Sequence, residues 1–260
     1  MNAPTASTVL VEHDGPVTIV SIDRPHARNA VDGPTAAFLA DAFRVFDADD
    51  DASVAVLTGT NGYFCAGADL KGVSEGRGNR VQSYGDGPMG PSRMLLDKPV
   101  IAAVEGHAVA GGFELALWCD LRIVADDAVF GVYCRRWGVP LMDGGTVRLG
   151  RLVGHGRALD IILTGRAVPA DEALQIGLAT RVVPKGETLS TAVAMARKIA
   201  GLPQGAMRSD RRSAYEQWSH ELPDALLAEY HHGMSTLLTG ETLAGVARYA
   251  SGDWTPEDFF

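Results

Sequence analysis

The first hydrophobic runs of the chain predict a hairpin followed by a helix. Residues 9–13 and 17–23 are apolar-rich and lie on either side of Asp14-Gly15, a pair typical of hairpin turns. Gly33-Pro34 then begins an amphipathic pattern that predicts a helix through about Asp47. The first unit is therefore expected to be two strands and one helix.

Further along, short apolar runs predict buried strands at residues 54–58, 100–105 and 121–125. Each run lies near a glycine-containing turn, and helical spacing follows most of them. This succession predicts an α/β layered fold. Between Lys71 and Arg93, glycine, serine, asparagine and proline occur without periodicity, which predicts a mobile loop beside the candidate site described below.

The back of the chain has mainly helical spacing, interrupted by glycine or proline. The predicted helices cover residues 171–178, 190–200, 204–218, 222–238 and 241–250. We therefore expect an α/β core over residues 1–200 and a helical region over residues 201–260.

Composition limits the classes of function. A chain of 260 residues with 46% hydrophobic residues is long enough for one large core. Its formal net charge of −9 argues against general binding to nucleic acid or to an anionic membrane. The seven histidines are scattered, so no metal site is predicted.

The three cysteines, Cys65, Cys119 and Cys134, have neither zinc-site spacing nor an even number, which favours reduced thiols and a cytoplasmic protein. The start of the chain lacks the basic and apolar segments of a signal peptide. The most apolar stretch, residues 100–119, is interrupted by charged residues, so neither export nor a membrane span is expected.

Two turns of small residues carry the candidate chemistry. Gly111-Gly112 precedes Glu114 in an otherwise apolar run, and Ala66-Gly67-Ala68 forms a second turn upstream. Backbone N–H groups in such turns can approach a ligand closely, which indicates a site that activates a carbonyl. The alternatives are two ordinary strand-to-helix turns and a glutamate stabilised only by the helix dipole.

Several motifs in order extend this picture: Ile22-Asp23-Arg24-Pro25, Asn29-Ala30, residues 64–70, residues 98–105, residues 111–120 and Gly144-Gly145-Thr146. Through them the chain resembles the crotonase, or enoyl-CoA hydratase/isomerase, superfamily over residues 9–183. The resemblance implies a spiral of ββα units, followed by a C-terminal helical region used in forming a homotrimer or hexamer.

The resemblance also implies chemistry on an acyl-CoA thioester, in fatty-acid or related acyl-CoA metabolism. The N–H groups of Ala68 and Gly111 would form an oxyanion hole that stabilises an enolate, and Glu114 would move the proton. No separate cofactor is expected, because coenzyme A is part of the substrate.

Family position further implies that His26, Arg28, Ala30, Ala66 and Lys71 contact coenzyme A. Its phosphates need cations. His26 stands where relatives often have a lysine, so one electrostatic contact is weakened at neutral pH. Each basic residue alone is more often a solvated surface charge.

The chain departs from the family pattern where hydratases carry a second glutamate, because Cys134 stands there. A buried thiol acting as a small apolar side chain is favoured over a nucleophile. Asp143 is the candidate replacement acid, with a cap of the helix beginning near Gly144 as the open alternative. Trp137, with its neighbouring arginines, is expected to shape the acyl pocket.

This departure leaves hydration and isomerisation both open, since relaying a proton requires fewer acids than adding water. A different class of protein also remains possible. A crotonase scaffold without the second glutamate could be a non-hydratase that binds acyl-CoA or regulates another process.

Overall fold

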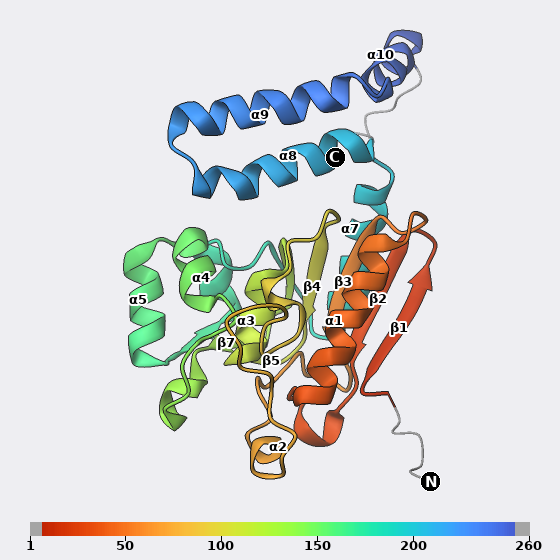
Figure 1. The fold of residues 1–260 in the computed structure, drawn as a ribbon. Helices are drawn as coiled ribbons and strands as arrows, with labels where there is room; N and C mark the ends of the chain where they lie inside the picture. The colour runs from red at the N-terminus through yellow and green to blue at the C-terminus, as the bar shows by residue number, and fades with distance from the viewer. Residues whose placement is uncertain (1–6, 253–260) are drawn as a thin grey trace. The chain divides into compact units, whose positions relative to one another are not determined.

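The structure, a computed structural model, describes residues 7–252 and divides after Arg197 into two compact units. The first unit, residues 1–197, contains all the strands that the structure describes (Figure 1). The second unit, residues 198–260, is helical over its described residues. This is a mixed α/β fold with a helical C-terminal region, as the sequence predicts.

The main sheet has six strands in the order β1-β2-β3-β4-β6-β9. They are β1 (Val9–Asp14), β2 (Val17–Ile22), β3 (Val54–Gly59), β4 (Val100–Val104), β6 (Leu121–Ala125) and β9 (Arg181–Val183). The predicted hairpin is confirmed, because β1 pairs antiparallel with β2, and the other pairings within this sheet are parallel. The central strands β3 and β4 are buried on both faces, which explains their unbroken apolar runs.

A second sheet contains the short strands β5 (His107–Val109), β7 (Val129–Gly131) and β8 (Ala167–Pro169). Two successive turns of chain each give one strand to each sheet, because β4 is followed by β5 and β6 is followed by β7. The helix α3 (Gly111–Trp118) follows β5 and completes one ββα turn. This alternation is the spiral that the resemblance implies.

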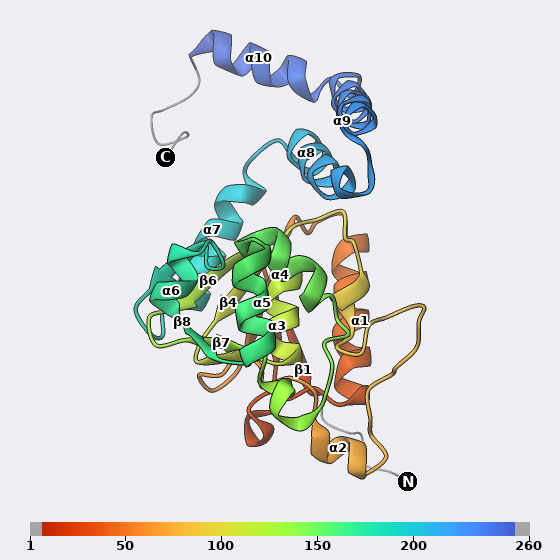
Figure 2. The ribbon, with the colours of Figure 1, turned by 90° about the vertical axis from the view of Figure 1, so that its left-hand side faces the viewer.

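The helix α1 (Gly33–Ala48) has the expected bounds and packs on β1 and β2 (Figure 2). Asp32 caps it by accepting a hydrogen bond of 3.1 Å from the N–H of Thr35. Its buried face includes Leu39, Phe43 and Phe46. On the other side of the unit, α3 contacts α4 (Gly145–Val153), and α4 contacts α5 (His155–Thr164).

The loop predicted over residues 71–93 lies beside the site, as expected, since several of its residues line the pocket described below. The short helix α2 (Leu70–Ser74) and a 3-10 helix (Pro91–Arg93) bound this stretch. Between them, the amide of Asn79 donates to the carbonyl oxygens of Val31 and Pro88 at 3.1 and 2.8 Å. The two short helices at the ends of this stretch have five and three residues, too few for periodicity to reveal them.

The remaining helices of the back part begin and end close to their predicted bounds: α6 (Ala170–Gln175), α7 (Thr188–Ala200), α8 (Gln204–Glu216), α9 (Leu222–Leu237) and α10 (Glu241–Ser251). In the second unit, Glu241 of α10 accepts hydrogen bonds of 2.9 and 2.8 Å from the N–H groups of Gly205 and Ala206, in the first turn of α8. Across residues 7–252, no helix combines the length and apolar character needed to cross a membrane.

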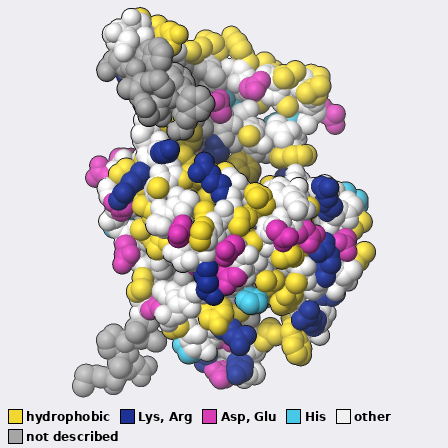
Figure 3. Space-filling view, turned by 180° about the vertical axis from the view of Figure 1, so that it is seen from behind, with side chains coloured by type: hydrophobic (Ala, Val, Ile, Leu, Met, Phe, Trp, Pro, Cys, Tyr) yellow, Lys and Arg dark blue, Asp and Glu magenta, His cyan; other side chains and the backbone are white. Residues whose placement is uncertain are grey.

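Large apolar side chains are exposed along the helices of this second unit, in the upper part of Figure 3. They are Leu202, Trp218, Leu222, Leu226, Leu227, Tyr230, Leu237, Leu238, Leu243, Val246 and Tyr249. Single exposed apolar residues are common on protein surfaces, but contiguous ones mark contact surfaces.

Candidate active site

The two small-residue turns identified in the sequence pack directly against each other. Cys65 and Ala108, which precede them, form a bridge between parallel segments. Gly67 has φ +96°, and a Cβ at this position would lie 2.8 Å from the Cβ of Ala110 and 3.0 Å from the nitrogen of Gly111. A glycine is therefore required for this close approach.

The N–H groups of Ala68 and Gly111 have no acceptor among the described residues. Gly67 and Asp69, on either side of Ala68, both bond to Val31, so the N–H of Ala68 points away from that segment. Gly111 begins α3, and the first N–H groups of a helix have no intrahelical partner. Two main-chain donors are thus available side by side.

Ala110, between β5 and α3, has an unusual backbone conformation with φ 52° and ψ −125°. This region is sparsely populated by residues other than glycine, and such strain is commonly found where function requires a fixed geometry. A hydrogen bond of 2.9 Å from the N–H of Ala110 to the carbonyl of Gly131 holds the turn. The turn directs the following N–H, that of Gly111.

A buried ion cluster supports the other turn. Arg24 is only 4% exposed and lies 2.9 Å from Asp69 and 3.1 Å from Asp32. Asp69 also caps α2 through a bond of 3.1 Å from the N–H of Gly72. Burial raises the pKa of Asp69, but the hydrogen bonds from Gly72 and Arg24 outweigh it and lower that pKa overall. The ionised cluster therefore fixes the chain immediately after Ala68.

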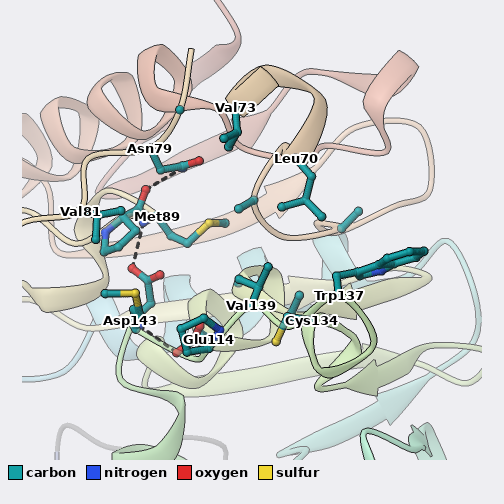
Figure 4. A pocket seen from close by; sticks show the side chains of 18 of the residues that line it. Leu70, Val73, Asn79, Val81, Met89, Glu114, Cys134, Trp137, Val139 and Asp143 are labelled. Carbon is teal, nitrogen blue, oxygen red and sulfur yellow. Dashed lines mark hydrogen bonds between the residues drawn. The ribbon is translucent and has the colours of Figure 1, made fainter. Parts of the chain in front are cut away.

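A pocket of about 410 Å³ opens beside these turns (Figure 4). The predicted site residues that line it are Ala66, Ala68, Gly111, Glu114, Cys134, Trp137 and Asp143. The other lining residues are mostly apolar: Leu70, Val73, Gly78, Asn79, Val81, Pro88, Met89, Ala110, Tyr133, Val139, Pro140 and Met142. Over residues 7–252, no group of three or more His, Cys, Asp or Glu side chains is arranged to hold a metal ion.

Glu114 is buried in the first turn of α3, with 2% of its surface exposed. Its Oε1 accepts hydrogen bonds of 2.8 Å from the N–H of Gly145 and 2.9 Å from the N–H of Asp143. Burial, together with the nearby charge of Asp143, raises the pKa of Glu114 to about 7, although these N–H bonds oppose the shift. At neutral pH this carboxyl can therefore both hold and release a proton.

Asp143 lies next to Glu114 and is 4% exposed. Its Oδ1 accepts a hydrogen bond of 2.9 Å from the N–H of Met89 and a short one from the hydroxyl of Ser92. Burial raises the pKa of Asp143, and the bond from Ser92 partly offsets this effect. Each acid thus has one oxygen held by two donors, Oε1 in Glu114 and Oδ1 in Asp143.

The alternative role of Asp143 as a helix cap is wrong. Gly144 occupies the N-cap position of α4, in a left-handed conformation, and no side chain caps that helix. The carboxylate of Asp143 instead turns toward Met89 and Ser92, which the sequence analysis did not single out. No local pattern marks either residue, because the contacts join positions more than 50 residues apart.

Cys134 and Trp137 lie in the 3-10 helix Tyr133–Trp137, further along the pocket in Figure 4. Cys134 is 7% exposed, and burial and the charge of Glu114 raise the pKa of its thiol. The side chain is therefore a neutral thiol at physiological pH. Trp137 is 72% exposed and forms part of the pocket rim.

The residues predicted to contact coenzyme A are only partly brought together. Ala66 lines the pocket, and its N–H donates to the carbonyl of Arg28 at 3.1 Å. His26 and Arg28 are exposed, as is Lys71 on α2, whereas Ala30 is buried. Of these five residues, only Ala66 is part of the pocket lining.

Comparison with known proteins identifies the family. The family model for enoyl-CoA hydratase/isomerase matches residues 12–252. Enoyl-CoA hydratase EchA19 of Mycobacterium tuberculosis is 40% identical over 60% of each chain, and probable enoyl-CoA hydratase echA8 of Mycobacterium leprae is 34% identical over 93% of this chain and 94% of the relative.

Comparison with solved structures identifies the same family. A crystal structure of enoyl-CoA hydratase from Mycobacterium tuberculosis superposes with a TM-score of 0.90 at 34% identity, covering 94% of this chain and 96% of the other. The chain therefore belongs to the enoyl-CoA hydratase/isomerase family and is an enzyme of that type.

Proposed function

We propose that the N–H groups of Ala68 and Gly111 bind the thioester oxygen of an acyl-CoA and that Glu114 moves a proton at the adjacent carbon. The observation that carries this proposal is the pocket itself. Two main-chain donors without partners and a buried carboxyl with a pKa of about 7 line the same pocket. Removing or adding a proton at C2 of a thioester places negative charge on its oxygen, and fixed donors stabilise that charge most in the transition state.

Hydration of a 2-enoyl-CoA is the reaction we favour. It needs a carboxylate that activates water at C3 and an acid that protonates C2. We assign the acid to Glu114 and the carboxylate to Asp143, since the nearby charge of Asp143 helps to raise the pKa of Glu114 to about 7. The active form would then be the pair carrying one proton.

Isomerisation of a 3-enoyl-CoA is the second candidate. Cys134 stands where hydratases carry a glutamate, and a neutral thiol supplies no second carboxylate. Glu114 alone would suffice to remove a proton from one carbon and return it to another. The other class of function is acyl-CoA binding without turnover. It would require that neither Glu114 nor Asp143 transfers a proton to or from the bound ligand.

The pocket lining supports an apolar acyl group, because most of its side chains are apolar. Coenzyme A would lie near His26, Arg28, Ala30, Ala66 and Lys71, with its phosphates toward the exposed basic side chains. No separate cofactor is part of this proposal, since coenzyme A is carried by the substrate.

We further propose a homotrimer or a hexamer, assembled through the helical region. The exposed apolar side chains of α9 and α10 support this, because burying them against another copy removes them from water. Light scattering on a gel-filtration column measures the state directly. A cytoplasmic location is also proposed, supported by the three cysteines, which are buried and unpaired.

The test uses panels of trans-2-enoyl-CoA and 3-enoyl-CoA substrates, with binding measured separately. Hydration of the first panel that is lost in Glu114→Gln supports the proposal. Turnover of the second panel alone favours isomerisation, and binding without turnover of either panel favours the non-catalytic function.

A further inference from the structure

We propose that Ser92 is a positioning residue, whose hydroxyl orients the carboxylate of Asp143 so that Oδ2 is the oxygen presented to the substrate. This proposal rests on the role of Asp143 as the second acid. Ser92 itself does not line the pocket.

The hydroxyl of Ser92 has a single hydrogen-bond acceptor in the described structure. Ser92 is 1% exposed, and its Oγ donates to Oδ1 of Asp143. The N–H of Met89 donates to the same oxygen at 2.9 Å. Two donors on Oδ1 leave Oδ2 for the pocket, which Asp143 lines.

A third residue fixes the distance between Ser92 and Asp143. Arg148 on α4 donates from Nη2 to the carbonyl of Ser92 and from Nη1 to the carbonyl of Asp143, both at 2.8 Å. One planar guanidinium therefore spans the two backbones that carry the hydroxyl and the carboxylate. The main chain is held independently of the side-chain bond.

The space around this bond is tightly defined. A Cβ at Gly87 would lie 2.0 Å from the hydroxyl oxygen of Ser92 and 2.8 Å from Oδ1 of Asp143. Any side chain at this position would displace the hydroxyl from the carboxylate. Glycine at position 87 therefore keeps room for the bond.

The bond matters because the terminal torsion of an aspartate is soft. Rotation about χ2 exchanges the two oxygens over a broad energy minimum, so neighbouring donors must choose the orientation. A hydroxyl donor selects one orientation and also stabilises the charged carboxylate. A displacement of about 1 Å at a reacting group can cost about 100-fold in rate.

The test is a double-mutant cycle on the full-length chain, with trans-2-enoyl-CoA hydration as the readout. Four proteins are compared: the parent, Ser92→Ala, Asp143→Asn and the double variant. We expect Ser92→Ala to lower kcat by about 10- to 100-fold with KM little changed. In the Asp143→Asn background the same change is expected to have no further effect.

Two further variants separate positioning from folding. Ser92→Cys keeps a side chain of similar shape but offers only a weak S–H donor, so it is also expected to lower kcat, and it takes the place of Ser92→Ala if that variant does not fold. Thr188→Val removes another buried hydroxyl that donates to a carboxylate, that of Glu105 at 2.8 Å, outside the pocket. It is expected to leave kcat and the pH profile unchanged.

The outcomes distinguish a failure of the role proposed for Ser92 from a failure of the role proposed for Asp143. Full activity in Asp143→Asn would overturn the role of Asp143 and that of Ser92 with it. If Asp143→Asn is impaired but Ser92→Ala is not, only the role of Ser92 is overturned. Equal losses from Ser92→Ala in both backgrounds would also overturn it, because Ser92 would then act independently of Asp143.

Discussion

The main-chain N–H of Asp143 donates to Oε1 of Glu114 over 2.9 Å, while the side chain of Asp143 turns toward Ser92 and Met89. The segment that carries the second acid therefore also holds the first. Because both acids depend on the same few residues, small changes in this segment are expected to alter proton transfer more than substrate binding.

Replacing Glu114 by glutamine is expected to change the pH dependence of stability. The pKa of this carboxyl is raised to about 7 in the folded protein, mainly by burial, whereas an unfolded chain leaves it near its ordinary value of 4.5. The stability due to its protonated form is thus complete below the unfolded pKa and is lost as pH rises through about 7. Glutamine does not titrate and keeps an oxygen for both N–H donors.

The difference in unfolding free energy between Glu114→Gln and the parent should therefore shift in favour of the variant by about 2–3 kcal/mol between about pH 5 and about pH 8. Urea denaturation at both pH values measures it. A difference that does not change with pH would show that Glu114 titrates normally.

The rate of hydration is expected to fall as pH rises above about 7. In the proposed mechanism Glu114 delivers the proton, and its pKa is raised to about 7. The plot of kcat/KM against pH reports this ionisation in the free enzyme. A rate that climbs steadily through about pH 8 would instead indicate that Glu114 acts as the base.

Gly145→Ala is expected to lower kcat about 10- to 100-fold. A Cβ at this position would lie 2.9 Å from both Cγ and Oε1 of Glu114, so the carboxyl must move. Gly156→Ala is the matched control, because that helical glycine has no heavy atom within 4 Å of the added Cβ. Steady-state kinetics on both variants should show a loss in the first and parental activity in the second; equal activities would contradict the assigned contact.

Glu241→Ala is expected to destabilise the helical region by about 1 kcal/mol. The carboxylate of Glu241 satisfies two N–H groups in the first turn of α8, and a negative charge there also interacts favourably with the helix dipole. Thermal unfolding followed by circular dichroism measures the change. An unaltered midpoint would mean that water replaces the carboxylate without cost.

Long patterns were predictable from the sequence, and short elements were not. The helix α1 has a proline near its start, a capping Asp32 and four turns of amphipathic spacing, so its bounds could be predicted. The strands β5 and β7 have three residues each, too few for any periodicity to appear. The helix α4 begins at Gly145, as expected from the sequence, although Gly144 and not a capping side chain precedes it.

In the site, too, residues within one local motif could be predicted, whereas contacts between distant residues could not. Gly111 and Glu114 stand together in one motif and could be singled out from the sequence. The bond between Ser92 and Asp143 joins residues 51 positions apart, and they come together because the 3-10 helix that carries Ser92 and the helix α4 that follows Asp143 both pack on α3. The sequence could propose Asp143 as an acid, but its helix-cap alternative could be rejected only from the structure.

Deuterium exchange at C2 of a saturated acyl-CoA tests the central claim most directly. Exchange requires only that the N–H groups of Ala68 and Gly111 stabilise an enolate and that Glu114 removes and returns the C2 proton, so it does not depend on the choice between hydration and isomerisation. Mass spectrometry after incubation in D₂O should show deuterium incorporation with the parent and none with Glu114→Gln, although both bind the ligand. Incorporation at the parental rate in Glu114→Gln would contradict the account.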